Sequence, residues 1–183
     1  MKPVVTAALV IFGLLVPVLA ATHSPAWMIN SHSAHAEQTN QSLVNDTQAF
    51  VTGDAPLPDV YDGRAAAHLE DVEDLVAVAE IIAFAAGLLV ILGLLYNDVF
   101  FLGAAWLAGI VVVVAGGSAV SFPTVFSAFH QLLFPAGSYV FRTDSLLIRT
   151  FPAAFFLDGV KQVALGSAAV LASYVALGVI QRR

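Results

Sequence analysis

The stretch LVAVAEIIAFAAGLLVILGLLYNDVFFLGAAWLAGIVVVVAGGSAV, residues 75–120, decides the fold of this chain. It contains two apolar runs, Leu75–Leu95 and Val99–Val120. A helix needs about 20 apolar residues to cross a hydrocarbon core about 30 Å thick, and each run meets that length. Only the tripeptide YND, residues 96–98, separates the runs. The sequence therefore predicts two membrane-spanning helices joined as a tight antiparallel hairpin.

Two further apolar stretches, Val4–Ala21 and Phe155–Ile180, flank this hairpin. Of the 183 residues, 59% are hydrophobic and 11% charged, whereas a soluble domain carries about 25% charged residues. The sequence predicts an all-α integral membrane protein with four transmembrane helices. The expected segments are a first span over 1–21, an outer helix that continues into the second span over 63–95, a third span over 99–120 and a fourth over 155–180.

Basic residues near the two chain ends predict the orientation. Lys2 precedes the first span, and Arg182 and Arg183 follow the fourth. Because basic residues favour the cytoplasmic side, we expect a multi-pass protein of the cell membrane with both termini cytoplasmic. Residues 22–62 then form a small extracytoplasmic cap between the first and second spans. Residues 121–154 form an extracytoplasmic loop that carries a histidine and several phenylalanines.

The first span has an alternative interpretation. A basic start, a short apolar core and the residues Val18-Leu19-Ala20 are also typical of a cleavable signal peptide. Cleavage would leave three spans and place the two termini on opposite sides of the membrane. The residues leave both interpretations open.

Three histidines, His23, His32 and His35, lie in the expected cap. No further metal ligands can be identified around them, so we expect solvated loop histidines there. In the expected membrane region only two histidines remain, which is too few for a metal triad. Neither a metal nor a cofactor is therefore expected.

Composition and motifs exclude several other classes of function. The chain has no cysteine, which excludes disulfides and thiol catalysis. Its formal charge of −6 argues against nucleic-acid binding, which requires basic patches. The motifs GxSxG, HExxH, Walker A and GxGxxG are all absent. The composition therefore predicts the lipid bilayer as a partner and no nucleic acid.

The first of the two histidines lies in YDGRAAAHLEDVEDLVAVAE, residues 61–80. Asp62 can cap a helix that continues into the second span. At helical spacing Arg64, His68 and Asp71 share one face, so Asp71 can hydrogen-bond one imidazole nitrogen. The alternative is an ordinary solvated helix start with surface ion pairs, which contribute little to stability.

The second histidine, His130, lies in SAFHQLLFPAGSYVF, residues 127–141. Its neighbours include Phe126, Phe129 and Phe134. Burying an imidazole without a partner costs roughly 1–3 kcal/mol, so His130 either has a partner or a function. The alternative is an interfacial histidine that meets water among the aromatic residues common at that depth.

Charged residues also occur near the outer ends of the expected spans. Glu80 lies in the second span, and Asp158 and Lys161 lie in the fourth at a spacing that lets them pair. Ionisable residues within membrane segments are functional candidates because burying their charge is costly. With Arg142, Asp144 and Arg149 they would gather polar groups at one level, as chemistry on a lipid headgroup or glycerol ester requires.

Two motifs combine these residues in order along the chain. The first is R-x-x-x-H-L-x-D-V, here Arg64, His68, Leu69, Asp71 and Val72. The second is F-H-x-x-x-F…D…L-I…F-P…F-F, here Phe129, His130, Phe134, Asp144, Leu147, Ile148, Phe151, Pro152, Phe155 and Phe156. Together they resemble the lipoprotein intramolecular transacylase family, over residues 60–160 in detail. Members of that family have four spans and an outer cap.

The resemblance implies a reaction and a set of site residues. The family moves the sn-2 acyl chain of a diacylglyceryl-cysteine lipoprotein onto the α-amino group of that cysteine, so a lipoprotein is the implied substrate. Its two catalytic histidines correspond to His68 and His130, which we then expect to lie within about 10 Å of each other so that both can address one ester. The supporting or substrate-positioning residues are then Arg64, Asp71, Tyr139, Asp144, Glu80 and Lys161, and the residues that contact the acyl chain are Phe126, Phe129 and Phe134.

Acid–base chemistry suits this pair of histidines. One takes a proton from the amine, and the other stabilises the oxyanion or protonates the departing glycerol oxygen. The residues do not decide which histidine has which role. No protein nucleophile is required, so the absence of cysteine and of a serine elbow is compatible with acyl transfer.

The sequence departs from the family pattern at several positions. Tyr139 replaces a usual tryptophan, Ala65 replaces an acidic residue, and Arg142-Thr143 replaces an aspartate–proline pair. A host with ether-linked lipids would also offer no sn-2 ester. Two alternatives therefore stay open beside the transacylase: a lipid-modifying hydrolase that uses the same histidines, and a non-enzymatic four-helix membrane protein.

Overall fold

The computed structural model describes residues 1–35, 40–96 and 98–183. Within these residues the chain forms helices and no strands. The helices are α1 (Lys2–Thr22), α2 (Pro25–His35), α3 (Gln41–Val51), α4 (Gly63–Gly93), α5 (Val99–Leu133), α6 (Leu146–Thr150) and α7 (Ala153–Gln181). Residues 36–39 of the expected cap and Asn97 of the expected hairpin turn lie outside the described residues.

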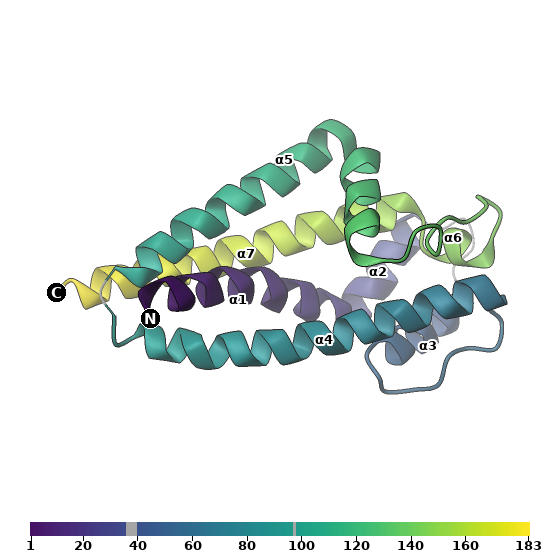
Figure 1. Cartoon of the computed structure of the whole chain (residues 1–183). Helices are drawn as coiled ribbons and strands as arrows, with labels where there is room; N and C mark the ends of the chain where they lie inside the picture. The colour runs from purple at the N-terminus through teal and green to yellow at the C-terminus, as the bar shows by residue number, and fades with distance from the viewer. Residues whose placement is uncertain (36–39, 97) are drawn as a thin grey trace.

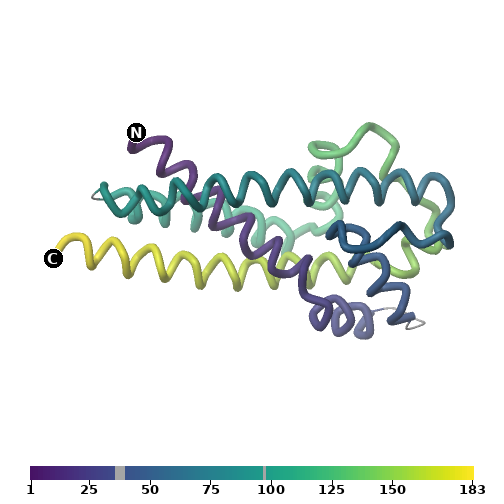
Figure 2. The backbone as a smooth tube through the Cα atoms, turned by 90° about the horizontal axis from the view of Figure 1, so that it is seen from below, coloured from purple at the N-terminus to yellow at the C-terminus, as the bar shows by residue number. Residues whose placement is uncertain are grey.

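Four of these helices, α1, α4, α5 and α7, are long and apolar enough to cross a membrane. The prediction of an all-α integral membrane protein with four transmembrane helices is confirmed. Figure 1 shows both termini at one end of the bundle, which we call the terminal end. Helix α1 crosses the others obliquely (Figure 2) and contacts α4, α5 and α7.

The shorter helices gather at the other end of the bundle, which we call the histidine end (Figure 1). The expected cap segment contains α2 and α3, which pack against each other. Asn40 begins α3 by accepting a hydrogen bond from the backbone N–H of Leu43 at 3.1 Å. An apolar cluster joins α2, α3, α4, α6 and α7 there: Met28, Leu43, Val44, Val51, Tyr61, Ala65, Leu69, Leu147, Phe151 and Phe155.

Helix α5 extends beyond the expected third span. We expected the span to end at Val120 and a loop to follow over residues 121–154, but α5 runs to Leu133 and α6 covers part of the remainder. The helix breaks at Ser121, whose φ of −151° and ψ of 84° are not helical. Pro123 explains the break, because proline lacks an N–H and its ring collides with the preceding turn. Figure 1 shows the second half of α5 turning sharply after the break and running back towards the other helices at the histidine end.

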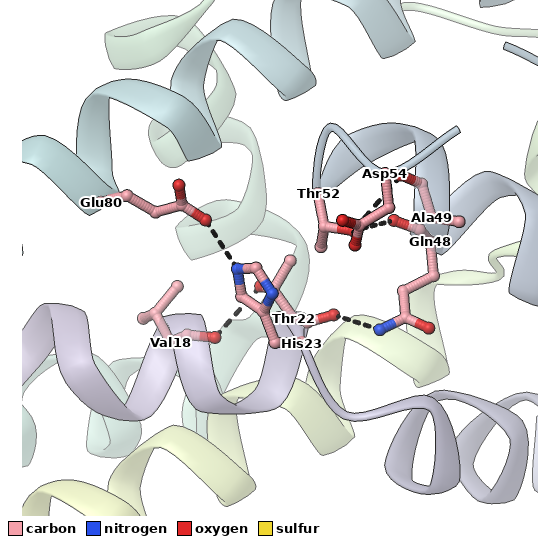
Figure 3. A network of polar contacts seen from close by, with 8 residues as sticks. All are labelled: Val18, Thr22, His23, Gln48, Ala49, Thr52, Asp54 and Glu80. Atoms are coloured by element: carbon pink, nitrogen blue, oxygen red, sulfur yellow. Dashed lines mark hydrogen bonds and ion pairs between the residues drawn. The ribbon is translucent and has the colours of Figure 1, made fainter. Parts of the chain in front are cut away.

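The expectation of solvated loop histidines in the cap segment is wrong for His32, whereas His23 and His35 are exposed but each lies against a carboxylate. His32 is 1% exposed within α2. His23 Nε2 lies 2.7 Å from Glu80 Oε1 of α4 (Figure 3), and His35 Nε2 lies 2.6 Å from Asp158 Oδ2 of α7. His32 is buried because α2 is helical here, and the ends of α1 and α2 also bring His23 and His35 against neighbouring helices.

Two further polar contacts fix the same region. Asp158 also accepts a hydrogen bond from Lys161 Nζ at 2.7 Å, which confirms the expected pairing of these two residues. Gln48 Nε2 of α3 donates to the carbonyl oxygen of Thr22 at 2.9 Å (Figure 3). The end of α1, the end of α2 and one residue of α3 are therefore each held by a side-chain contact to another helix.

Close backbone approach holds α1 against α7. A Cβ atom on Gly166 would lie 2.7 Å from Pro17 Cβ, a separation that is shorter than real Cβ atoms essentially ever show. Beside it, the buried hydroxyl of Ser167 donates to the carbonyl oxygen of Gly13 at 3.1 Å. About two turns of α7 further towards the terminal end, the hydroxyl of Tyr174 donates to the carbonyl oxygen of Leu9 at 2.9 Å.

Replacing Gly166 with alanine should therefore destabilise the bundle. The added methyl group meets the rigid ring of Pro17, and overpacking of this kind costs about 1–3 kcal/mol. Gly109→Ala in α5 is the matched control, because nothing lies within 4 Å of its Cβ position and alanine favours helix by about 1 kcal/mol. Thermal unfolding in detergent should show a lower midpoint for Gly166→Ala and an equal or higher one for Gly109→Ala. Equal midpoints for Gly166→Ala and the parent would contradict this packing.

Candidate active site

Two histidines from different helices face each other at the histidine end. The ring centroids of His68, from α4, and His130, from the second half of α5, lie 6.0 Å apart, and the rings are stacked at 29°. Each residue is only 8% exposed. The expected separation of less than about 10 Å is confirmed. Two buried imidazoles at this spacing can both reach a single small functional group.

The start of α4 fixes the position of His68. Asp62 caps the helix by accepting hydrogen bonds from the backbone N–H groups of Arg64 and Ala65, at 3.1 and 2.9 Å. Ala65 and Leu69 then bury against the apolar cluster, with 3% and 5% exposed. Because the side chains of Ala65 and Leu69 are packed into the bundle, His68 between them also faces the bundle rather than solvent.

One nitrogen of His130 has a hydrogen-bond partner within its own helix. Its Nδ1 lies 2.8 Å from the carbonyl oxygen of Phe126, one turn earlier. A carbonyl oxygen only accepts, so Nδ1 must carry the proton in this contact. In the neutral imidazole this leaves Nε2 as an acceptor. The contact therefore selects the tautomer in which Nε2 is the nitrogen that can accept a proton.

Aromatic rings surround the same imidazole. Ring centroids lie 4.1 Å from His130 for Phe126, 5.5 Å for Phe129, 5.4 Å for Phe134 and 5.3 Å for Tyr139. The predicted phenylalanines and the predicted tyrosine thus all contact this histidine. Their rings exclude water from one side of it.

His68 has a less complete set of partners. Its ring contacts Phe134 and Phe141, with centroids 4.9 and 5.4 Å away. Its Nδ1 is buried and has no hydrogen-bond partner among the described residues. A buried polar atom left unpaired costs about 1–3 kcal/mol. An unsatisfied nitrogen beside a second histidine is typical of a site that awaits a ligand.

The expected hydrogen bond between the His68 imidazole and the Asp71 carboxylate is not formed among the described residues. The ring of His68 turns towards Phe134, Phe141 and His130, whereas Asp71 lies nearly one turn later and is partly exposed. Sequence spacing placed the two residues on one face, and the packing of the aromatic rings decided the direction of the imidazole.

The remaining predicted residues divide into two groups. Arg64 lies near the histidines, because its Nη1 donates to the carbonyl oxygen of Val140 at 3.3 Å and so ties α4 to the segment that carries Tyr139. Asp144 forms a two-bond ion pair with Arg142, at 2.9 Å for each bond, and both are exposed. Arg142 therefore lowers the pKa of the Asp144 carboxyl. Glu80 pairs with His23 and Lys161 pairs with Asp158, so their partners are not His68 or His130.

A chain of ring contacts connects α2 to His130, which the sequence analysis did not find. Trp27 contacts Phe155 at 5.3 Å, Phe155 contacts Phe156 at 5.2 Å, and Phe156 contacts Phe126 at 5.2 Å. Phe155 and Phe156 were part of the motif, but nothing in the pattern joined Trp27 to them. Phe141, which contacts His68, was also missed, because a loop residue carries no periodicity that predicts its direction.

No group of three or more His, Asp or Glu side chains in the described residues lies together as a metal ion would require. The site consists of imidazoles, aromatic rings and one arginine beside them. This arrangement can transfer protons and surround an apolar chain.

The family profile described as "Lipoprotein intramolecular transacylase Lit" matches residues 5–156, which is most of the chain. The chain belongs to the lipoprotein intramolecular transacylase family. It is an acyltransferase of that family and an integral membrane protein. The match contains both histidines and all the rings that contact them. No curated protein sequence matches the chain significantly.

Solved structures of a transacylase of this family share the fold. The lipoprotein intramolecular transacylase Lit from Bacillus cereus superposes with a TM-score of 0.82 at 16% identity, covering 99% of this chain and 95% of that one. Two variants of the same Bacillus cereus protein, each with one histidine replaced, superpose with TM-scores of 0.73. They are 15% and 16% identical and cover 99% of this chain and 90% and 92% of theirs. At this identity the likeness shows the fold alone.

The tautomer of His130 can be measured directly in this transacylase. Imidazole nitrogen-15 chemical shifts at a pH where the ring is neutral should show the proton on Nδ1 of His130, because the carbonyl oxygen of Phe126 lies 2.8 Å away. His130→Gln assigns the resonance by its disappearance. A proton on Nε2 would contradict the geometry of the site.

Proposed function

We propose that this transacylase moves an ester-linked acyl chain of a diacylglyceryl lipoprotein to the amino group of the lipoprotein's N-terminal cysteine. The two buried imidazoles, 6.0 Å apart in a chain of this family, carry the proposal. The amine and the ester belong to one molecule, so proximity supplies part of the rate, worth about 7–11 kcal/mol when alignment is good. The protein then has to hold the reacting groups in line and move one proton.

His130 acts as the general base. The contact between its Nδ1 and the carbonyl oxygen of Phe126 supports this role, because it leaves the Nε2 lone pair available. Nε2 takes a proton from the neutral amine as nitrogen attacks the ester carbonyl carbon, and a C–N bond forms. The same proton passes to the glycerol oxygen when the C–O bond breaks. Atoms and charges balance without a protein nucleophile, and positioned acid–base catalysis of this type contributes about 10²–10⁴-fold.

His68 stabilises the oxyanion of the tetrahedral intermediate. Its buried Nδ1 has no partner in the described residues, so a hydrogen bond to the substrate oxygen satisfies a group that the protein leaves unpaired. A donor of this kind in a site that excludes water stabilises developing negative charge more strongly than water does. The two histidines thus have different roles despite their similar burial.

The acyl chain lies against the rings of Phe126, Phe129 and Phe134. These rings contact His130, and Phe129 is 49% exposed and so available to a lipid tail. An ester whose chain packs on these rings places its carbonyl carbon beside the imidazoles. Apolar packing and proton transfer then act on neighbouring atoms of one substrate.

The other predicted residues position these groups. Arg64 and Tyr139 hold the segment after α5 over the histidines, and Asp71 contributes its negative charge near His68. Indirect positioning roles belong to Glu80, Lys161 and Asp144, which hold neighbouring segments in place through their ion pairs. Such residues should alter the rate less than either histidine does, because they orient rather than transfer.

The site faces the extracytoplasmic side and both termini face the cytoplasm. Lys2, Arg182 and Arg183 at the terminal end support this orientation. Figure 1 shows the histidine end at the opposite end of the same bundle. The site would then lie on the side where a lipoprotein carries its lipid.

Acyl transfer can be tested with a synthetic diacylglyceryl lipopeptide and mass spectrometry of its N-terminus. The parent protein should give an N-acyl, lyso-form product. His68→Ala and His130→Ala should each reduce the rate by about 10²-fold or more. His23→Gln removes only the partner of Glu80 outside the site and should reduce the rate far less. Circular dichroism and size-exclusion chromatography show that each variant is folded.

Two controls separate this proposal from other chemistry. A lipopeptide with an sn-2 ether should remain unchanged, because no acyl group can leave. Loss of the acyl chain to water without N-acylation would contradict the proposal and would indicate a hydrolase. Folded alanine variants that retain full activity would contradict the roles of the histidines.

A further inference from the structure

An open groove runs between α1 and α5 at the terminal end, away from the two histidines. Its volume is about 600 Å³. In Figure 1 the starts of these two helices lie together near both termini. The residues that line it and carry the argument are Lys2, Thr6, Val10, Leu102, Trp106 and Ile110.

The lining changes in polarity along the groove. On α1, Lys2, Thr6 and Val10 are four residues apart, so they share one helix face in the order charged, hydroxyl and apolar. On α5, the apolar Leu102 and Ile110 share a face with Trp106, which is 62% exposed. The twelve residues of α5 from 99 to 110 span about 18 Å. A groove of this length and polarity fits one amphiphile, with its charged end at Lys2.

The hydroxyl of Thr6 points to a polar occupant. Thr6 is 7% exposed, and its Oγ1 is buried with no hydrogen-bond partner among the described residues. Other hydroxyls that face α1 do have partners: Ser167 donates to the carbonyl oxygen of Gly13, and Tyr174 donates to that of Leu9. Rotation about χ1 would turn this hydroxyl towards the groove, where a ligand with an acceptor at this level would satisfy it.

The charge at the mouth of the groove favours an anion. Lys2 is exposed and forms no ion pair within the described residues. Asp98 also lines the groove, but Arg182 binds it, with Nη2 2.6 Å and Nε 3.0 Å from Oδ1. The carboxylate is therefore neutralised, and the ammonium group of Lys2 remains.

We propose that this groove binds a membrane glycerophospholipid with a net negative headgroup. The phosphate lies at Lys2, an ester carbonyl oxygen accepts a hydrogen bond from Thr6, and one acyl chain lies along Val10, Trp106 and Ile110. The charged, hydroxyl and apolar levels of the groove thus match the phosphate, the ester and the acyl chain of such a lipid, in that order. The site lies at the opposite end of the bundle from the histidines, so it is separate from the proposed reaction and does not depend on it.

Trp106 allows this binding to be measured. The chain has two tryptophans, so Trp27→Phe leaves Trp106 as the only indole. The full-length Trp27→Phe protein is reconstituted in nanodiscs of phosphatidylcholine. Increasing mole fractions of phosphatidylglycerol brominated along its acyl chains, or of equally brominated phosphatidylcholine, are then included. Quenching of Trp106 fluorescence reports the lipid that occupies the groove.

Brominated phosphatidylglycerol should reach half-maximal quenching at a mole fraction about 5-fold lower than brominated phosphatidylcholine. One basic residue near an anionic lipid is worth about 1 kcal/mol, which corresponds to that factor. Lys2→Gln should abolish the preference. Thr6→Val should weaken quenching by both lipids and retain the preference between them, because both carry the same esters.

Arg183→Gln is the matched control, because it removes one positive charge from the same end but does not line the groove. It should leave the preference unchanged. Quenching that follows the bulk mole fraction equally for both lipids would overturn the proposal. An equal loss of preference in Arg183→Gln and Lys2→Gln would also overturn it, because the attraction would then belong to the whole end of the bundle. Circular dichroism of each variant shows that the helices are intact.

Discussion

The break in α5 at Ser121 is the constraint on which the rest of the histidine end depends. A straight helix over the 35 residues of α5 would extend about 52 Å, far beyond a hydrocarbon core about 30 Å thick. His130 would then lie away from every other helix. Pro123 prevents that path, and Ser121 begins the second half with its hydroxyl 2.8 Å from that of Thr124. The returning half brings His130 within 6.0 Å of His68.

The two imidazoles share their burial but differ in their hydrogen bonds. His130 satisfies one nitrogen within its own helix, through the carbonyl oxygen of Phe126. His68 leaves a buried nitrogen without a partner in the described residues. Aromatic rings around both imidazoles exclude water, so few other hydrogen-bond partners can reach that nitrogen of His68. The proposed roles of the two histidines, one as proton acceptor and one as hydrogen-bond donor, rest on this difference.

The sequence predicted the spans well, because apolar length is a property of each segment alone. It also predicted that the two histidines lie close together, through motifs and topology. It did not predict the return of α5, although Pro123 was visible, because the local pattern does not set the direction of the chain after a break. The direction of the His68 ring and the pairing of His23 with Glu80 depend on contacts between helices, which spacing within one helix does not determine.

The most direct test is an experimental structure of the protein in a lipid bilayer with an ether-linked diacylglyceryl lipopeptide, which binds like the substrate but cannot react. The proposed function predicts the N-terminal amine within about 2.6–3.2 Å of His130 Nε2, with the sn-2 linkage between the two imidazoles. A lipopeptide whose linkage contacts neither imidazole would contradict the account.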